Sequence, residues 1–131
     1  YGRPLSLIVL DVDHFKAIND GQGHLAGDDL LRGIARALRL RLRSTDILGR
    51  YGGDEFVITL PETQVDDACA IAQAIRQSCA DECGASVSLG VADFSADLAP
   101  DFDALFQRAD QALYRAKDAG RGCVQRYQAA D

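Results

Sequence analysis

One near-continuous aliphatic run, Leu5–Leu10 with the sequence LSLIVL, constrains the fold of this chain more than any other feature. The run has the length of a strand and lacks the alternation of polar and apolar residues found in half-exposed strands. Such a pattern is typical of a strand whose sheet is covered on both faces. We therefore expect a central strand between two layers of helices, with Asp11 at the point where the strand ends.

The segment after this strand predicts two helices. A short helical turn is expected around His14–Ile18, and Gly21 and Gly23 are expected to end it. Leucine and isoleucine then recur at helical spacing over Leu30–Leu42, which predicts an amphipathic helix. Asp28 and Asp29 are expected at its start, where carboxylates interact favourably with the helix dipole.

A hairpin and a second set of alternating elements follow. Ile47–Tyr51 and Phe56–Leu60 are predicted as two strands joined by the tight turn 52–55. The remaining predicted elements are a helix through Ala68–Ile75, a strand through Val87–Val91, a helix through Leu105–Leu113 and a last strand over Gly122–Tyr127. The order β-α-β-β-α-β-α-β predicts an α+β fold, a ferredoxin-like core with an added helix and strand. Because no repeat or linker interrupts it, we expect one domain over residues 1–131.

Composition narrows the classes of function. The net charge of −6 argues against binding to a nucleic-acid polymer, which favours basic domains, but it leaves a nucleotide substrate open because bound cations reverse the local field. No apolar run reaches membrane-spanning length and no signal peptide begins the chain. The four cysteines lack the spacing of a zinc site and are expected to be reduced thiols. These features favour a cytoplasmic location, with a membrane-bound parent protein still open.

Two aspartates are the first candidates for chemistry. A hairpin antiparallel to the first strand brings its turn beside that strand's end, so Asp11 and Asp54 are expected to meet at one edge of the sheet. Carboxylate oxygens in such a pair suit Mg²⁺ or Mn²⁺, which in turn bind phosphates. Taken singly, each aspartate is better explained as a helix cap or a turn residue. The adjacent Gly52 and Gly53, which leave backbone amides open to a nucleotide, favour the metal interpretation.

Four ordered sequence blocks resemble the GGDEF family of diguanylate cyclase domains. The resemblance covers essentially the whole chain with the correct spacing between blocks, which makes it far more specific than a five-letter match. The blocks are RYGGDEF at Arg50–Phe56, the DxDxFKxxNDxxGHxxGD pattern at Asp11–Asp28, SLGVA at Ser88–Ala92 and ADQALYRAK with a following GR at Ala109–Arg121. The resemblance implies a palm-type antiparallel central sheet flanked by helices, related to nucleotidyl cyclase folds.

The resemblance also implies a role for individual residues. Asp54 and Glu55 would be the catalytic carboxylates. Asp11, Asp54 and the carbonyl of Val12 would bind Mg²⁺ or Mn²⁺. Residues that would contact GTP are His14, Phe15, Lys16, Asn19, Asp28, Gly52, Gly53, Lys117 and Arg121. Of these, Asn19 and Asp28 would recognise guanine and the basic residues would contact the triphosphate. Leu25 and Leu31 are also expected at the guanine pocket, whereas Phe56 and Tyr114 are expected in the core.

The implied reaction is the condensation of two GTP molecules into cyclic di-GMP. The 3′-hydroxyl of one GTP attacks the α-phosphate of the other, and pyrophosphate leaves. Since one domain holds one GTP, the active species is expected to be a homodimer. The alternative is a catalytically inactive GGDEF module that binds GTP or cyclic di-GMP as a sensor. A haloacid-dehalogenase phosphatase, an EF-hand and a P-loop are disfavoured because their required residues do not occur around Asp11 or elsewhere.

A second candidate site lies upstream of the hairpin. Arg43 and Asp46 form an RxxD sequence, which in the GGDEF family is the inhibitory site for the product cyclic di-GMP. The simpler interpretation is the exposed end of a helix, where Arg43 favours the dipole. A further arginine that often joins this site would fall at Ala74, with Arg76 the nearest basic residue. The family also carries a DxLTGLxNRR-type segment before the first strand, so an upstream regulatory region is expected.

Overall fold

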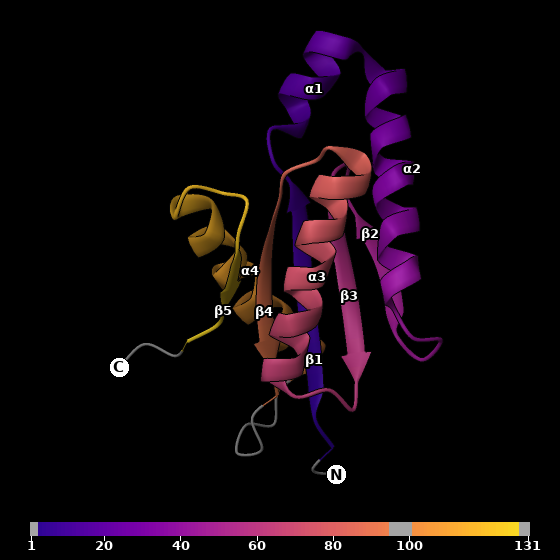
Figure 1. Ribbon diagram of the computed structural model, residues 1–131. Helices are drawn as coiled ribbons and strands as arrows, with labels where there is room; N and C mark the ends of the chain where they lie inside the picture. Colours follow the sequence, from indigo (N-terminus) through magenta and orange to yellow (C-terminus); the bar gives the residue numbers. More distant parts are fainter. Residues whose placement is uncertain (1–2, 95–100, 129–131) are drawn as a thin grey trace.

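The computed structural model describes residues 3–94 and 101–128, and within these residues five strands form one sheet in the order β2-β3-β1-β4-β5 (Figure 1). Helices α2 and α3 cover one face of the sheet and α4 covers the other. The strands are β1 (Leu5–Val12), β2 (Ile47–Tyr51), β3 (Glu55–Pro61), β4 (Val87–Asp93) and β5 (Val124–Arg126). The helices are α1 (Phe15–Gln22), α2 (His24–Arg41), α3 (Val65–Cys83) and α4 (Phe102–Asp118).

The first four strands have the ferredoxin-like arrangement that the sequence predicts. Strand β1 pairs antiparallel with both β3 and β4, and β2 pairs antiparallel with β3. The added strand β5 differs, because it pairs parallel with β4 after the crossover through α4. The sheet is therefore mixed, and the expectation of an antiparallel sheet is confirmed only for the four-stranded core.

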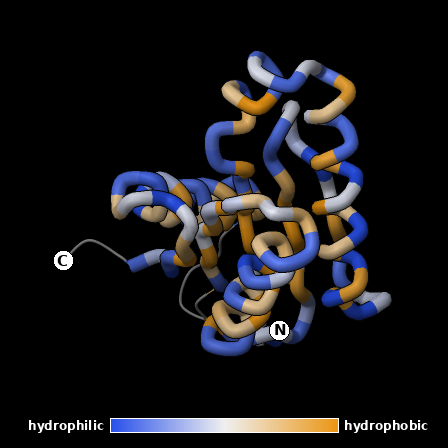
Figure 2. The backbone as a smooth tube through the Cα atoms, turned by 45° about the horizontal axis from the view of Figure 1, so that its top comes forward, coloured by the Kyte–Doolittle hydropathy of each residue, from blue (hydrophilic) through white to orange (hydrophobic). Residues whose placement is uncertain are grey.

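Strand β1 supplies the centre of both hydrophobic layers. Ile8 and Leu10 pack with α2 and α3, whereas Leu7 and Val9 pack with α4. All four are fully buried, and burial of each aliphatic side chain contributes about 1.5–3 kcal/mol. This double burial explains the continuous aliphatic run, and Figure 2 shows hydrophobic colouring on the strands beneath the helices.

A glycine sets the close approach of α4 to the sheet. A β-carbon at Gly90 of β4 would lie 2.1 Å from the carbonyl oxygen of Ala109 and 2.3 Å from the amide nitrogen of Leu113. A larger residue would push the helix away. Gly90 therefore fixes how near the middle of α4 lies to β4.

The helix boundaries correct two predictions. Helix α1 continues through Gly21 and ends at Gly23, whose φ of 91° suits glycine. Helix α2 begins at His24, so Asp28 and Asp29 lie beyond its first turn, and the predicted interaction with the helix dipole is wrong. Because α1 and α2 are separated by one glycine, Asp28 lies close to the α1–α2 junction.

Two properties of the described chain bear on its chemistry. None of its helices combines the length and the apolar character that crossing a membrane requires. The four cysteines are free thiols, and burial raises the pKa of Cys79 to about 12, which keeps that thiol protonated and unreactive.

Candidate active site

The turn of the β2–β3 hairpin lies beside the C-terminal end of β1. Asp11 pairs with Glu55 across the antiparallel ladder, and the amide of Val12 donates to the carbonyl oxygen of Asp54 at 3.2 Å. The register thus brings the carboxylates of Asp11, Asp54 and Glu55 to one edge of the sheet.

Asp11 lies on the α4 side of the sheet because it continues the alternation of Leu7 and Val9. Its side chain is 13% exposed, and its Oδ2 atom forms an ion pair with Lys117 near the end of α4. Within residues 3–94 and 101–128, Oδ1 of Asp11 is buried without a hydrogen-bond partner. An unsatisfied buried carboxylate oxygen is costly, which makes it a natural ligand for a cation.

The electrostatics of the neighbouring carboxylates also favour a bound cation at this edge of the sheet. Burial raises the pKa of Asp54, and the side chain and charge of Asp11 raise it further. Burial also raises the pKa of Glu55, with contributions from Asp110 and Asp11. Lys117 opposes both shifts, but a single ammonium does not balance the clustered carboxylates. The site has an excess of negative charge that a divalent cation would neutralise.

The donor set fits a hard cation that shares its coordination with a substrate. In the part of the chain that the structure describes, no three His, Cys, Asp or Glu side chains converge to hold a metal by themselves. Asp11 and Asp54 would supply two carboxylates and the carbonyl of Val12 a third oxygen. Mg²⁺ commonly completes such a partial set with phosphate oxygens and water.

The hairpin turn leaves space above these carboxylates. Gly52 has a φ of 64°, and a β-carbon at Gly52 or Gly53 would meet no atom within 4 Å. Arg50 closes the turn by donating from Nη2 to the carbonyl oxygen of Gly53 at 2.7 Å. Arg50 belongs to the RYGGDEF motif, but the sequence pattern gives no sign of this role in the turn.

A second polar site lies at the junction of α1 and α2. Oδ1 of Asn19 is buried and has no hydrogen-bond partner among the described residues. A β-carbon at Gly27 would lie only 1.8 Å from this atom, so glycine is required for the Asn19 amide to occupy its position. Asp28 follows directly and is exposed. The structure therefore brings the two residues expected to recognise guanine to one junction.

The end of α4 brings two basic residues to the same edge of the molecule. The amide of Arg121 donates to the carbonyl of Ala116 and the amide of Gly120 to that of Lys117. These two bonds form a Schellman motif, which ends the helix at Ala119. Both cations thus lie at the helix C-terminus, where the dipole favours positive charge.

The other predicted contacts lie at the start of α1. His14 is exposed and precedes α1 with a φ of 57°. Lys16 is also exposed, in the first turn of the helix. The ring of Phe15 instead packs in the core with Leu31, so its side chain supports the junction from below.

The burial of three apolar residues bears on the sequence predictions. Tyr114 is 70% exposed, so its assignment to the core is wrong. The buried stripe of α4 runs through Leu113 and Ala116, and the helical rotation of Tyr114 turns it toward solvent. Phe56 is buried, as expected. Leu25 is 82% exposed, so its place in a guanine pocket remains a prediction.

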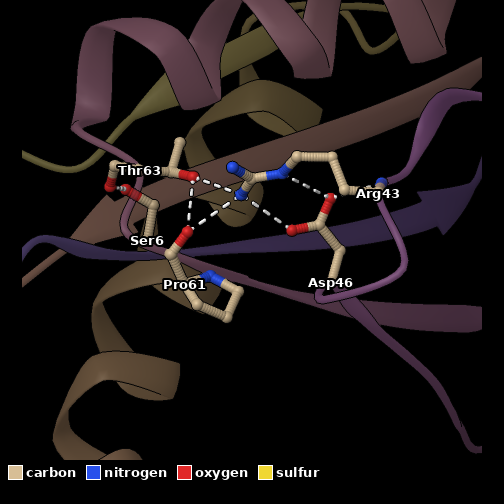
Figure 3. A network of polar contacts seen from close by, with 5 residues as sticks. All are labelled: Ser6, Arg43, Asp46, Pro61 and Thr63. Atoms are coloured by element: carbon tan, nitrogen blue, oxygen red, sulfur yellow. Dashed lines mark hydrogen bonds and ion pairs between the residues drawn. The ribbon is translucent and has the colours of Figure 1, made fainter.

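Arg43 and Asp46 lie in the loop between α2 and β2 (Figure 3). Nη2 of Arg43 donates to Oδ1 of Asp46 at 2.9 Å, to the carbonyl oxygen of Pro61 at 2.9 Å and to Oγ1 of Thr63 at 2.8 Å. The Arg43 side chain remains 52% exposed, whereas that of Asp46 is 2% exposed. The hydrogen bond and charge of Asp46 raise the pKa of Arg43.

This network is separate from the carboxylate site. Pro61 ends β3 and Glu55 begins it, so the two sites lie at opposite ends of a strand about 20 Å long. A cavity of about 560 Å³ adjoins Arg43 and is also lined by Arg3 and Glu62. Arg76 lines a different cavity, beside Gly84 and Gly122.

Comparison with known proteins agrees with this geometry. The family model for the diguanylate cyclase GGDEF domain matches residues 1–123. The chain is 45% identical over 128 residues to the diguanylate cyclase DgcP of Pseudomonas aeruginosa, covering 92% of this chain and 19% of that protein. It is 40% identical to DosC of Escherichia coli strain K12, covering 98% and 30%. The chain thus spans less than a third of either curated relative.

Solved structures show the same fold. The active GGEEF domain of a diguanylate cyclase from Vibrio cholerae superposes with a TM-score of 0.92 at 35% identity, covering 98% of this chain and 85% of that one. The GGDEF domain of DgcB from Caulobacter crescentus, solved in complex with c-di-GMP, gives 0.85 at 32% identity, covering 95% and 78%. The carboxylate edge, the glycine turn and these matches together establish that the chain belongs to the GGDEF family of diguanylate cyclase domains.

Proposed function

We propose that this domain condenses two GTP molecules into cyclic di-GMP and two pyrophosphates. The observation that carries the proposal is that the Asp11 and Asp54 carboxylates lie together beneath an open glycine turn, with an unsatisfied oxygen on Asp11 and excess negative charge. Membership in the GGDEF family supports the same reaction.

The geometry suggests how one GTP would bind. Asn19 and Asp28 would read the guanine edge, because a carboxylate accepts from N1 and N2 hydrogens while an amide both donates and accepts. The triphosphate would then extend toward the glycine turn. Lys16, Lys117 and Arg121 would neutralise its charge, and the amides at Gly52 and Gly53 are open for close approach.

The reaction requires one bond to form and one to break at each α-phosphorus. The 3′-oxygen of one GTP bonds to the α-phosphorus of the other, and the bond from that phosphorus to pyrophosphate breaks. The hydroxyl proton must leave, and Glu55, whose carboxylate lies at the same edge of the sheet, would accept it while Asp54 holds the cation. Mg²⁺ or Mn²⁺ held by Asp11, Asp54 and the Val12 carbonyl would supply Lewis-acid stabilisation of phosphate charge.

One domain offers one guanine site, so the complete reaction needs two. We therefore propose that two copies face each other as a homodimer, each contributing a bound GTP. Positioning of the two nucleotides then accounts for most of the catalysis.

Arg43 and Asp46 are proposed as the inhibitory product site. The exposed Arg43 guanidinium suits the guanine edge or a phosphate of cyclic di-GMP. The adjoining cavity of about 560 Å³ would admit one base of the product.

The test is incubation of the purified domain with GTP and Mg²⁺, with products resolved by chromatography. We expect cyclic di-GMP from the wild type and none from Asp54→Asn. Binding of GTP without turnover by the wild type would contradict the proposal and favour the sensor alternative.

A further inference from the structure

The loop after α4 has an unusual backbone. Three successive residues have positive φ angles: 113° at Gly120, 64° at Arg121 and 61° at Gly122. The two glycines adopt these angles readily, but a left-handed conformation at Arg121 costs roughly 1–2 kcal/mol. Such a conformation persists only where surrounding contacts fix it.

A buried carboxylate fixes the far side of this turn. The amide of Gly122 donates to Oδ2 of Asp13 at 3.0 Å and to Oγ of Ser88 at 3.1 Å. Asp13 also accepts from Oγ of Ser86 at 2.6 Å and from Oγ of Ser88 at 2.7 Å. Its backbone amide donates to the carbonyl oxygen of Ser86, which ties the end of β1 to the start of β4.

Burial of the Asp13 carboxylate costs free energy, which is explained if the carboxylate holds the turn in place. Asp13 is 6% exposed, and the three hydrogen-bond donors that contact its carboxylate are all neutral. Burying a carboxylate without a paired cation is unfavourable even when it is hydrogen-bonded. An apolar residue at position 13 would stabilise the core more than the carboxylate does, but it would not bind the Gly122 amide. The carboxylate therefore suits a site where the turn must be fixed.

We infer that Asp13 is a positioning residue: it fixes the Gly120–Gly122 turn and thereby places the Arg121 guanidinium against the triphosphate. The inference rests on the proposed function, because it assigns Arg121 to a bound GTP. Asp13 itself touches no substrate. It acts on Arg121 through the Gly122 amide, while the Schellman motif fixes the other side of the same turn.

The test measures binding of 3′-deoxy-GTP and 3′-deoxy-GMP, which lack the attacking hydroxyl and cannot react. In Asp13→Asn, one acceptor oxygen becomes an amide donor and the turn loses its anchor. We expect the dissociation constant for the triphosphate to rise roughly tenfold, the size of one lost charge-assisted hydrogen bond, and that for the monophosphate to stay unchanged. The double variant with Arg121→Ala should bind the triphosphate no more weakly than Arg121→Ala alone.

Two buried serines provide a matched control. Ser88→Ala removes a hydroxyl that contacts both Asp13 and Gly122, so it should weaken the triphosphate selectively. Ser6→Ala removes an equally buried hydroxyl that donates to the Thr63 carbonyl at the opposite end of the sheet, and it should leave the ratio of the two ligands unchanged.

Two outcomes would overturn the inference. If Asp13→Asn weakened both ligands equally, its role would be structural only. If the effects of Asp13→Asn and Arg121→Ala were additive, Asp13 would act by another route, such as the nearby Asp11. A wild type that binds the triphosphate selectively but makes no cyclic di-GMP would contradict the proposed function and leave this inference standing.

Discussion

The backbone of Gly27 lies so close to Asn19 that a β-carbon at Gly27 would stand 1.8 Å from the Asn19 side-chain oxygen. The same β-carbon would lie 3.1 Å from the ring of Phe15. Two helices that are joined by a single glycine thus pack around the amide expected to recognise guanine. A substitution at Gly27 can therefore disturb ligand recognition while the helix stays stable.

We predict that Gly27→Ala impairs guanine recognition without unfolding the domain. Alanine favours a helix over glycine by about 1 kcal/mol, which offsets part of the steric cost, but the Asn19 amide must move. GTP affinity should fall roughly tenfold, as for loss of one hydrogen-bonding group, while the affinity for ATP changes little, so the preference for GTP narrows. The measurement is calorimetric titration with both nucleotides.

Gly33→Ala on the same helix is the control for this experiment. A β-carbon there meets only Sγ of Cys83, at 3.6 Å, which is an ordinary contact. It should raise the melting temperature and leave nucleotide selectivity intact. Unchanged preference for GTP in Gly27→Ala would rule out the steric argument.

Asp54→Asn should abolish synthesis while making the cation-free domain more stable at neutral pH. The fold raises the pKa of Asp54 above its ordinary 3.8, mainly through burial and then through Asp11, so the folded state favours the protonated form. A raised pKa means that this stability is present at low pH and is lost as pH rises through the folded value. The neutral amide avoids that loss.

The check is the melting temperature of wild type and Asp54→Asn across the acid to neutral range without divalent cation. The difference should grow as pH rises above 3.8. Turnover in the variant should fall roughly a thousandfold or more, since a metal's contribution is several kcal/mol. Equal melting curves at all pH values would show that Asp54 is not under electrostatic strain.

The sequence predicts that Asp11 and the hairpin turn meet, because the pattern of apolar runs and turn residues determines which strands pair. An aliphatic run ending in Asp11 and a hairpin turning at Gly52 and Gly53 leave few topologies, and the antiparallel register then brings Asp11 to Glu55. The expected roles of these residues in metal and GTP binding come from the family resemblance, because spacing alone does not provide them.

Sequence reasoning failed where tertiary contacts override local signals. Gly21 looked like a helix end, but α1 passes through it because α2 packs alongside. Tyr114 looked like core because it adjoins the apolar stripe, yet one residue of helical rotation exposes it. Asp13 belonged to a recognised motif without a role, and only the fold brings Gly122 to its carboxylate.

Lys117 is expected to act as a substitute cation when no divalent metal is bound. Its ammonium pairs with Asp11, whose side chain is largely buried, while Lys117 itself is 35% exposed. Lys117→Met should therefore destabilise the metal-free domain by about 1–3 kcal/mol, less than loss of a fully buried pair. The rise in melting temperature on adding Mg²⁺ should be larger in the variant than in the wild type. An equal rise in both proteins would contradict competition between Lys117 and the metal for Asp11.

The network around Arg43 would make the proposed product site separable from the proposed catalytic edge. Arg43 is held by Asp46, Pro61 and Thr63, yet half of its side chain stays accessible beside the cavity. Product would contact this exposed part, whereas the buried Asp46 keeps the guanidinium oriented. Because Pro61 and Glu55 lie at opposite ends of β3, product at the proposed site would not block GTP at the carboxylate edge.

Arg43→Ala should weaken cyclic di-GMP binding by roughly 1.5–3 kcal/mol, the range for a lost hydrogen bond to a charged group, and leave the initial rate of synthesis unchanged. Product should then accumulate to a higher level than with the wild type. Thr63→Val is the matched control, because it removes one partner of Arg43 while keeping the guanidinium. It should lower stability and reduce product affinity only slightly. Direct titration with cyclic di-GMP decides the matter: equal affinity in wild type and Arg43→Ala would reduce the Arg43–Asp46 pair to a loop-stabilising contact.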